Sequence, residues 1–436
     1  MIAAAAFRCR ALLRRARAGW RLFGAALDRR RELGWAGLLA RAAAQRPMPG
    51  ASIAAPLPPP GAAFDVIYAI GYWPGEPKRY RVANVAEGLR EAGYAVHVMP
   101  YDRVADIVQR QWTARALVLF RAEYDPLVGI AQVIAYARAR GTLLVYDIDD
   151  LLFDERLVGR IDGLRHMRGF ERRRFVAAIA RHRRLLLACD RATVSTAPLA
   201  RAVEALGRPA VVVPNGLNRE QLRLAGELGD RQGGREEVVR IGYFSGSRTH
   251  ERDFRECEPA LLDLMARNAD IRLRLVGPLD LGAEWARHAD RIERLPLQPP
   301  AELLRLVAET DINLAPLERG NPFCEAKSEL KFFEAALVGV PTVASATEPF
   351  AAAIEDGVSG CLAAGDADWR RALDGLVASP ERRRAMGAAA RRRALARHGP
   401  ATVVRRAAAA LDLPGLDLPG LDLPGLDLPG LGLPAR

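Results

Sequence analysis

Short runs of branched apolar residues alternate with helix-like stretches along most of the chain. Runs of this kind are typical of strands buried on both faces of a parallel sheet, because helices cover both faces. Two series of them predict an α/β chain with two Rossmann-like doubly wound parallel-sheet domains facing a cleft. The predicted strands are 65–70, 95–99, 116–120, 142–148, 192–196 and 210–214, then 238–244, 271–277, 291–296, 311–317 and 341–345.

A polar, glycine-bearing stretch at 218–237 separates the two series, so a first domain is expected over 62–216 and a second over 217–400. Residues 1–46 precede them as an arginine-rich extension, and residues 47–61 contain six prolines, which favour an extended linker. Residues 401–436 are expected to form a terminal helix and a tail. LDLPG occurs there four times in tandem over 411–430, and proline and glycine in every repeat predict disorder.

Most of the positive charge lies at the N-terminus. Of the net charge of +12, residues 1–60 contribute +9, from eleven arginines against Asp28 and Glu32. Apolar residues three or four apart, flanked by arginines, predict a basic amphipathic helix. This helix either lies on an anionic membrane surface, or packs on its own domain or stays poorly ordered. The nearly neutral remainder, with 6% aromatic residues, argues against nucleic acid as a partner.

The sequence has only weak signals for membrane insertion, secretion, disulfide bonding or zinc binding. No apolar run reaches the roughly 18–20 residues of a membrane span, and the apolar start is too short for a signal peptide. The expected location is cytoplasmic, peripheral at the inner membrane face if the extension binds lipid. Five cysteines are scattered without a metal-type spacing, so neither a disulfide framework nor a zinc site is predicted.

The segment 318–345 carries the strongest chemical signal. Only Lys78, Lys327 and Lys331 among the 64 basic residues are lysines, and the last two lie four apart on one face of a predicted helix. Lysine is a compact point charge suited to a phosphate, and a helix N-terminus adds amide donors. The alternative is that both lysines pair with surface acids.

The same segment resembles the donor-binding segment of retaining GT-B glycosyltransferases of family four, where a glutamate-alanine pair precedes Gly-x-Pro. Here these are Glu334-Ala335 and Gly339-Val340-Pro341. The runs at 213–218 (VPNGLN), 241–254 and 275–278 are similar to the same family, in a bacterial subgroup marked by YDIDDLLFD at 146–154. The resemblance covers roughly 62–400. It implies an acceptor-binding first domain and a second domain that binds a nucleoside-diphosphate sugar.

The resemblance also implies roles for single residues. Glu334 would accept hydrogen bonds from the ribose hydroxyls. Arg248 and Lys327 would be the catalytic cations that stabilise charge on the departing diphosphate. The other donor-binding candidates are Asn215, Gly216, Gly246, Ser247, Glu325 and Lys331.

One position departs from the family. A second glutamate usually stands eight residues before the ribose-binding one, where this chain has Ala326. Glu325 is adjacent and can serve if the loop shifts, or Lys327 has a phosphate role instead.

Four residues of the first domain are candidates for the acceptor or the cleft: Arg81, Arg121, Asp149 and Asp150. The triplet Asp147-Ile148-Asp149 also has the Asp-x-Asp form of a metal site in a different glycosyltransferase fold. The GT-B resemblance favours orientation of acceptor hydroxyls or of the loop, without a metal or another cofactor.

These observations predict a glycosyltransferase that moves a sugar from a nucleoside-diphosphate sugar to a hydroxyl, with retention and without a metal. A glycan or lipid-linked acceptor in surface polysaccharide assembly is implied by the resemblance. The alternatives are a nucleotide-sugar epimerase of the same fold and an inactive nucleotide-sugar-binding protein, for which Ala326 is the best argument.

Overall fold

The computed structural model describes residues 57–71, 77–160, 167, 169–229, 238–246 and 251–415. The chain divides into two units at Pro60, and the features discussed below belong to the second unit, Pro60–Arg436. The predicted extension (1–46), most of the linker, Ser247, Arg248 and the last three LDLPG copies lie outside the described residues.

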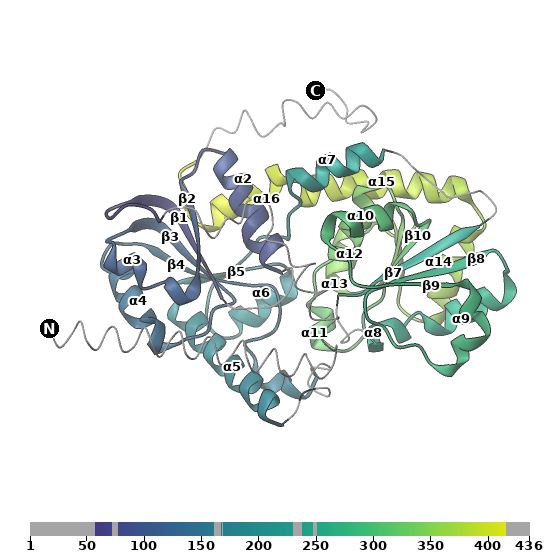
Figure 1. Cartoon of the computed structure of the whole chain (residues 1–436), viewed down its shortest axis with the longest axis horizontal. Helices are drawn as coiled ribbons and strands as arrows, with labels where there is room; N and C mark the ends of the chain where they lie inside the picture. Colours follow the sequence, from purple (N-terminus) through teal and green to yellow (C-terminus); the bar gives the residue numbers. More distant parts are fainter. Residues whose placement is uncertain are drawn as a thin grey trace. The chain divides into compact units, whose positions relative to one another are not determined.

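Two six-stranded parallel sheets form the framework (Figure 1). The first has the order β2-β1-β3-β4-β5-β6 and the second the order β12-β11-β10-β7-β8-β9. Every predicted strand is present, and the two Rossmann-like domains predicted from the alternation are confirmed. One short strand, β12, was missed because only three residues, Cys361–Ala363, form it.

The first sheet and its helices have the following bounds. The strands are β1 Ala63–Ile70, β2 Val96–Pro100, β3 Thr113–Phe120, β4 Leu143–Ile148, β5 Arg191–Val194 and β6 Ala210–Val212. The helices are η1 Arg79–Ala83, α2 Asn84–Glu91, η2 Tyr101–Arg103, α3 Asp106–Gln109, η3 Pro126–Val128, α4 Ile130–Arg138, η4 Glu155–Arg160, α5 Gly169–Ala188 and α6 Ala197–Glu204.

The second sheet follows the same plan. Its strands are β7 Val239–Phe244, β8 Ile271–Val276, β9 Ile292–Leu295, β10 Ile312–Ala315, β11 Thr342–Ser345 and β12. Its helices are α7 Arg219–Leu228, α8 Glu251–Arg255, α9 Glu258–Arg267, η7 Ala283–Arg291, α10 Pro300–Ala308, α11 Pro322–Glu325, α12 Leu330–Leu337, α13 Glu348–Ala353, α14 Asp366–Val377 and α15 Pro380–His398, followed by α16 Pro400–Ala410.

Helices cover both faces of each sheet, and the strands β3, β4, β7 and β10 are buried over most of their length. In the first domain, α3, α4, α5 and α6 supply the core on one face. The other face is covered by α2 and by the terminal helix α16, whose Val404 reaches the position where a side chain on Gly88 would be. The end of the chain therefore returns to the first domain after the second has been completed (Figure 1).

The Gly339-Val340-Pro341 motif of the segment that resembles a donor-binding segment has a structural reason in the backbone at the end of α12. Gly339 has φ +74°, a left-handed conformation that favours glycine. The Val340 amide donates to the Ala335 carbonyl and the Gly339 amide to the Ala336 carbonyl, which together close α12 as a Schellman motif. Pro341 then leads into β11.

The first LDLPG copy was expected to be disordered, and this expectation was wrong. Leu411 and Leu413 are buried in the core of the first domain. Arg191 donates to both carboxylate oxygens of Asp412, at 3.0 and 2.8 Å, and the Tyr94 hydroxyl donates to the Pro414 carbonyl at 2.8 Å. Composition alone gives no sign of these contacts, because all four copies have the same sequence.

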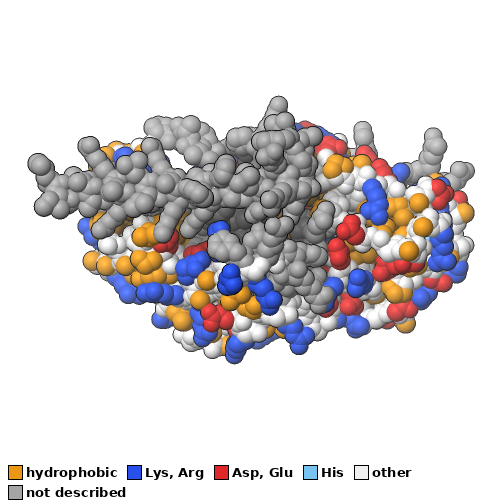
Figure 2. All heavy atoms as spheres, turned by 60° about the horizontal axis from the view of Figure 1, so that its bottom comes forward, with side chains coloured by type: hydrophobic (Ala, Val, Ile, Leu, Met, Phe, Trp, Pro, Cys, Tyr) orange, Lys and Arg blue, Asp and Glu red, His pale blue; other side chains and the backbone are white. Residues whose placement is uncertain are grey.

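The surface of the described residues carries mixed charge. In the view of Figure 2, basic and acidic side chains are interspersed over the parts that are coloured. Among the described residues no helix is long and apolar enough to cross a membrane.

Candidate functional site

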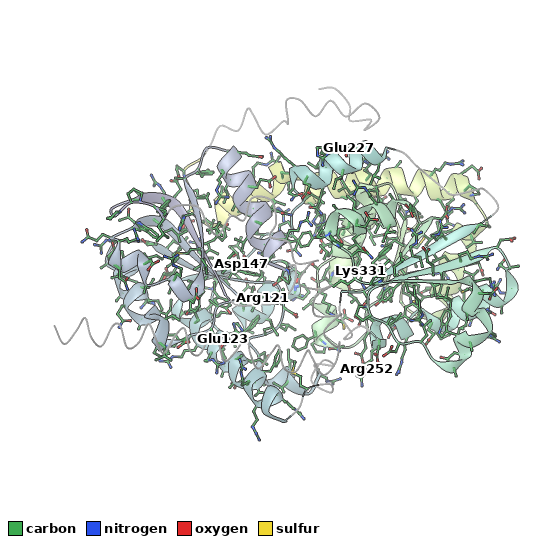
Figure 3. All side chains as sticks on the ribbon, in the orientation of Figure 1. Arg121, Glu123, Asp147, Glu227, Arg252 and Lys331 are labelled. Carbon is green, nitrogen blue, oxygen red and sulfur yellow. The ribbon has the colours of Figure 1, made fainter. Side chains whose placement is uncertain are left out.

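The residues predicted to bind the nucleotide-sugar donor lie at the carboxyl edge of the second sheet, which is where open α/β sheets bind ligands. Gly246 follows β7, and α11 and α12 follow β10. Figure 3 shows Lys331 of α12 at the side of the second domain that faces the first. The loop after β7, which contains Ser247 and Arg248, continues outside the described residues.

Lys327 is paired with a buried acid. Its Nζ lies 3.6 Å from Oδ2 of Asp253, whose side chain is 3% exposed. Burial acts to lower the pKa of Lys327, but the carboxylate of Asp253 and, more weakly, that of Asp150 raise it above its usual value. Lys327 precedes α12 and does not share a helical face with Lys331, because Ala326–Glu329 is a turn and loop; the predicted single helix was wrong here. The alternative to a phosphate role, that Lys327 pairs with an acid, agrees with this contact to Asp253.

Lys331 has a different environment. Its Nζ is buried and makes no hydrogen bond with the described residues. It lies 4.4 Å from the centre of the Tyr243 ring at the end of β7. Burial lowers the pKa of Lys331 to about 8, and Lys327 adds to the effect while Asp253 opposes it. A desolvated ammonium without a hydrogen-bonding anion is a candidate ligand for one.

Glu334 stands one turn further along α12 and contacts the first domain. The hydroxyl of Tyr80, in η1, donates to Oε1 of Glu334. The ring of Tyr80 lies edge-on to Phe333, with centroids 6.1 Å apart. Tyr80 was not a candidate from the sequence, although it stands next to one that was, Arg81.

Ala326, at the position where the family has a second glutamate, makes an apolar contact. Ala326 is 3% exposed and packs with Phe323 into the core of the first domain, and its carbonyl accepts a hydrogen bond from Thr196 Oγ1 at 2.8 Å. The adjacent Glu325 accepts a hydrogen bond at Oε1 from the Gly320 amide at 3.2 Å within its own loop. Its contact with the donor stays a prediction.

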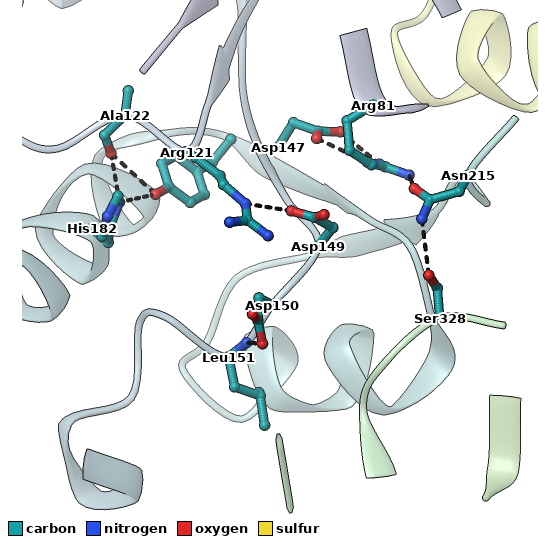
Figure 4. Close-up of polar contacts among 11 residues, drawn as sticks. Arg81, Arg121, Ala122, Asp147, Asp149, Asp150, Leu151, His182, Asn215 and Ser328 are labelled. Atoms are coloured by element: carbon teal, nitrogen blue, oxygen red, sulfur yellow. Dashed lines mark hydrogen bonds and ion pairs between the residues drawn. The ribbon is translucent and has the colours of Figure 1, made fainter. Parts of the chain in front are cut away.

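Arg81 is a correction to the prediction. It is 1% exposed and donates to both carboxylate oxygens of Asp147, at 3.0 and 2.7 Å (Figure 4). Asp147 also accepts from Thr193 Oγ1 at 2.6 Å. The charge of Arg81 is thus neutralised inside the first domain, where it cannot meet an acceptor. Arg81 was named because a cation in the loop after the first strand was expected to meet a donor phosphate or an anionic acceptor, with a solvated cation as the alternative.

Arg121, Asp149 and Asp150 do come together after β3 and β4. Arg121 has φ +41°, a strained conformation for a residue with a side chain, and donates from Nε to Asp149 Oδ1 (Figure 4). The Leu151 amide donates to Oδ1 of Asp150 at 3.0 Å. Burial raises the pKa of Asp150, although the cations Arg121 and Lys327 act in the opposite direction. Backbone strain beside a perturbed carboxyl is typical of functional sites.

Asn215 and Gly216 lie at the crossing between the domains. Asn215 Nδ2 donates to Ser328 Oγ at 2.9 Å, and the Gly216 carbonyl accepts from Asn84 Nδ2 at 2.7 Å. The Asn215 carbonyl is 2.9 Å from Nδ1 of His398. These two donor-binding candidates therefore contact α2 of the first domain, the loop before α12 and the end of α15.

A further hollow of about 880 Å³ lies at the amino ends of the first-domain strands, lined by Asp65, Arg115, Asp190 and Asp412 among others. Three of its charged side chains are in ion pairs, Arg115 with Asp65 and Asp412 with Arg191. Among the described residues no group of three or more His, Cys, Asp or Glu side chains is arranged to hold a metal ion.

Residues 252–411 match the family model described as "Glycosyl transferase-like". A curated D-inositol 3-phosphate glycosyltransferase from Segniliparus rotundus is 30% identical over 142 residues, which is 30% of this chain and 30% of that protein's length. The matched stretch thus spans under a third of the curated relative.

Solved structures of similar fold cover both domains. Alr3699/HepE from Anabaena, in complex with UDP and glucose, has a TM-score of 0.52 at 14% identity over 80% of this chain and 99% of its own. Sucrose-phosphate synthase from Thermosynechococcus elongatus has 0.53 at 16% identity over 80% and 98%. WaaG, a glycosyltransferase involved in lipopolysaccharide biosynthesis, has 0.51 at 13% identity over 79% and 98%.

The two parallel-sheet domains therefore have the GT-B architecture of these glycosyltransferases. The match to the glycosyl transferase-like model lies in the second domain and the terminal helix α16.

Proposed function

We propose that the chain transfers a glycosyl group from a nucleoside-diphosphate sugar to a hydroxyl acceptor, with retention and without a bound metal. The observation that carries the proposal is the Lys331 ammonium, which is buried one turn from Glu334 at the carboxyl edge of the second sheet and has no hydrogen-bonding anion among the described residues. A diphosphate placed there supplies the missing anion, and the ribose comes within reach of Glu334.

The chemical task is departure of the diphosphate. The bond between the anomeric carbon and the phosphate oxygen breaks, a bond to the acceptor oxygen forms, and the hydroxyl proton is released. Negative charge grows on the diphosphate, so preorganised cations stabilise the transition state more than the ground state. In this proposal Lys331 takes the phosphate role first assigned to Lys327, while Lys327 with Asp253 supports it. Arg248 and Ser247 remain proposed diphosphate contacts.

The acceptor is proposed to bind beside Asp149 and Asp150. Arg121, which donates to Asp149, has a strained backbone conformation, and the pKa of Asp150 is raised. A glycan or lipid-linked acceptor in surface polysaccharide assembly is consistent with the involvement of WaaG, to which the fold is similar, in lipopolysaccharide biosynthesis.

Calorimetric titration with UDP, GDP and dTDP tests donor binding. At least one is expected to bind, and Lys331→Met and Glu334→Ala are each expected to weaken binding by about 1–3 kcal/mol, the range for a hydrogen bond to a charged group. Arg223→Met is the matched control, because it removes one exposed positive charge from α7. Failure of all three nucleotides to bind would contradict the proposal.

Turnover of a labelled nucleotide sugar tests catalysis. We expect slow donor hydrolysis that persists in excess EDTA, with the released sugar keeping its anomeric configuration by NMR. Inversion, loss of activity with EDTA, or isomerisation of the intact donor would each contradict one part of the proposal.

We further propose that residues 1–46 hold the enzyme at the anionic inner membrane face, where a lipid-linked acceptor is available. The support is the +9 charge and amphipathic spacing of the N-terminal sequence. Deletion of 1–46 is expected to abolish sedimentation with anionic liposomes and to leave nucleotide affinity unchanged. Equal sedimentation of both forms would contradict it.

A further inference from the structure

Three consecutive residues of η1 connect the first domain to the second and to the crossing between them. Arg79 Nη2 lies 3.5 Å from Glu220 of α7, Tyr80 donates to Glu334 of α12, and Arg81 donates to the Val213 carbonyl just before the crossing. The turn is wound as a π-helix, a conformation often found at functional sites. It directs three neighbouring side chains toward three different elements.

Tyr80 belongs to the core of the second domain although its backbone is in the first. It is 5% exposed and is grouped with Leu217, Leu222, Phe332 and Phe333. A buried tyrosine ring needs a partner for its hydroxyl. Glu334 is that partner, so burial of the ring fixes where the hydroxyl meets the carboxylate.

The contact has a consequence for the carboxylate. A glutamate side chain has several rotamers, and ordering it on ligand binding costs free energy. An ionised carboxylate accepts about four hydrogen bonds, so the tyrosine hydroxyl and a ribose diol can share it. Tyr80 can therefore orient Glu334 in advance without competing for all of its acceptor sites.

We propose that Tyr80 is a positioning residue for the nucleotide ribose: it presets the Glu334 carboxylate and makes ribose recognition depend on the first domain. This inference rests on the proposed function, because it assigns a ribose to Glu334. Since the hydroxyl comes from the first domain, the second domain alone holds an incompletely positioned ribose site.

The test compares a ribonucleotide with its 2′,3′-dideoxy form. With the nucleoside diphosphate that binds the wild type, Tyr80→Phe is expected to weaken affinity about five- to tenfold, because ligand binding must then order the Glu334 side chain. Affinity for the dideoxy form is expected to stay within about twofold. A merely structural role would weaken both ligands equally.

Tyr94→Phe is the matched control. Tyr94 is also a buried first-domain tyrosine whose hydroxyl donates, but its partner is the Pro414 carbonyl. This variant is expected to bind both nucleotides like the wild type. Thermal unfolding of each variant reports whether the fold is retained.

A double-mutant comparison completes the test. Glu334→Ala with Tyr80→Phe is expected to bind no more weakly than Glu334→Ala alone, because Tyr80 acts through that carboxylate. Additive losses, an unchanged ribose-to-dideoxy ratio in Tyr80→Phe, or tighter binding by that variant would each overturn the inference while leaving nucleotide binding intact. If no nucleotide binds the wild type, the proposed function fails and this inference fails with it.

Discussion

The buried ammonium of Lys331 predicts a pH dependence of nucleotide binding that can be worked out in advance. Its pKa is lowered from the usual 10.5 to about 8 by burial. If a diphosphate binds the cationic form and restores the usual pKa, affinity falls as pH rises through 8. Between pH 7 and pH 9 the fraction of free protein in which Lys331 is protonated drops about tenfold. The dissociation constant therefore rises about tenfold, which is a loss of about 1.4 kcal/mol in binding free energy.

The same linkage fixes the number of protons exchanged. At pH 9 Lys331 is about 90% neutral in the free protein and almost fully charged in the complex, so binding takes up about 0.9 proton; at pH 7 it takes up about 0.1. Calorimetry at constant ionic strength, in two buffers of different ionisation enthalpy, measures this uptake. The diphosphate itself is fully ionised at pH 9 and contributes none.

Lys331→Met is the control for this assay. It is expected to bind weakly at both pH values, without proton uptake at pH 9. Uptake that persists in Lys331→Met would assign the proton to another group. Absence of uptake by the wild type at pH 9 would refute the argument that a desolvated lysine receives the phosphate.

Three further predictions concern stability and are checked by chemical denaturation. Glu329 is buried between Arg397 at 3.1 Å and His398 at 3.4 Å, so Glu329→Gln is expected to cost about 3 kcal/mol at pH 7. Although burial opposes it, the pKa of Glu329 is lowered by His398 and Arg397; this stabilisation is therefore lost as pH falls below the usual 4.5, where both forms should converge. Gly339→Ala, at φ +74°, is expected to cost about 1 kcal/mol through α12, whereas the same change at Gly246, which has no atom within 4 Å of an added Cβ, should cost less. Ala326→Glu places a carboxylate in an apolar contact, so we expect a loss of several kcal/mol and no gain in turnover; unchanged stability would contradict the packing described.

The fold could be predicted because its signal is spread over many residues. Each strand has several branched residues, and burial on both faces makes every one of them apolar, so an error at one position changes nothing. The exception was β12, whose three residues lie below the length at which a run is distinctive. The docked first LDLPG copy was missed for the opposite reason, since low complexity hides the single copy that has partners.

Site residues were harder because their roles depend on contacts between distant segments. Lys331 was named from its spacing to Lys327, although α12 does not extend back to Lys327, and Glu334 was named from the family resemblance. Arg81 could not be separated from a solvated cation without knowing that Asp147 lies beside it. Tyr80 gave no signal, because a tyrosine among arginines is ordinary until Glu334, 254 positions away, is brought to its hydroxyl.

The return of α16 to the first domain means that the backbone passes between the domains twice, and the two passages are joined. The Leu217 amide donates to the His398 carbonyl at 2.9 Å, and His398 Nδ1 lies 2.9 Å from the Asn215 carbonyl. One connecting segment would allow the two domains to rotate about it. Two connecting segments that are hydrogen-bonded to each other resist this rotation, so bending at the crossing is the easier motion. The domains are therefore expected to open and shut along one arc, returning Tyr80 to the same place on Glu334 at each closure.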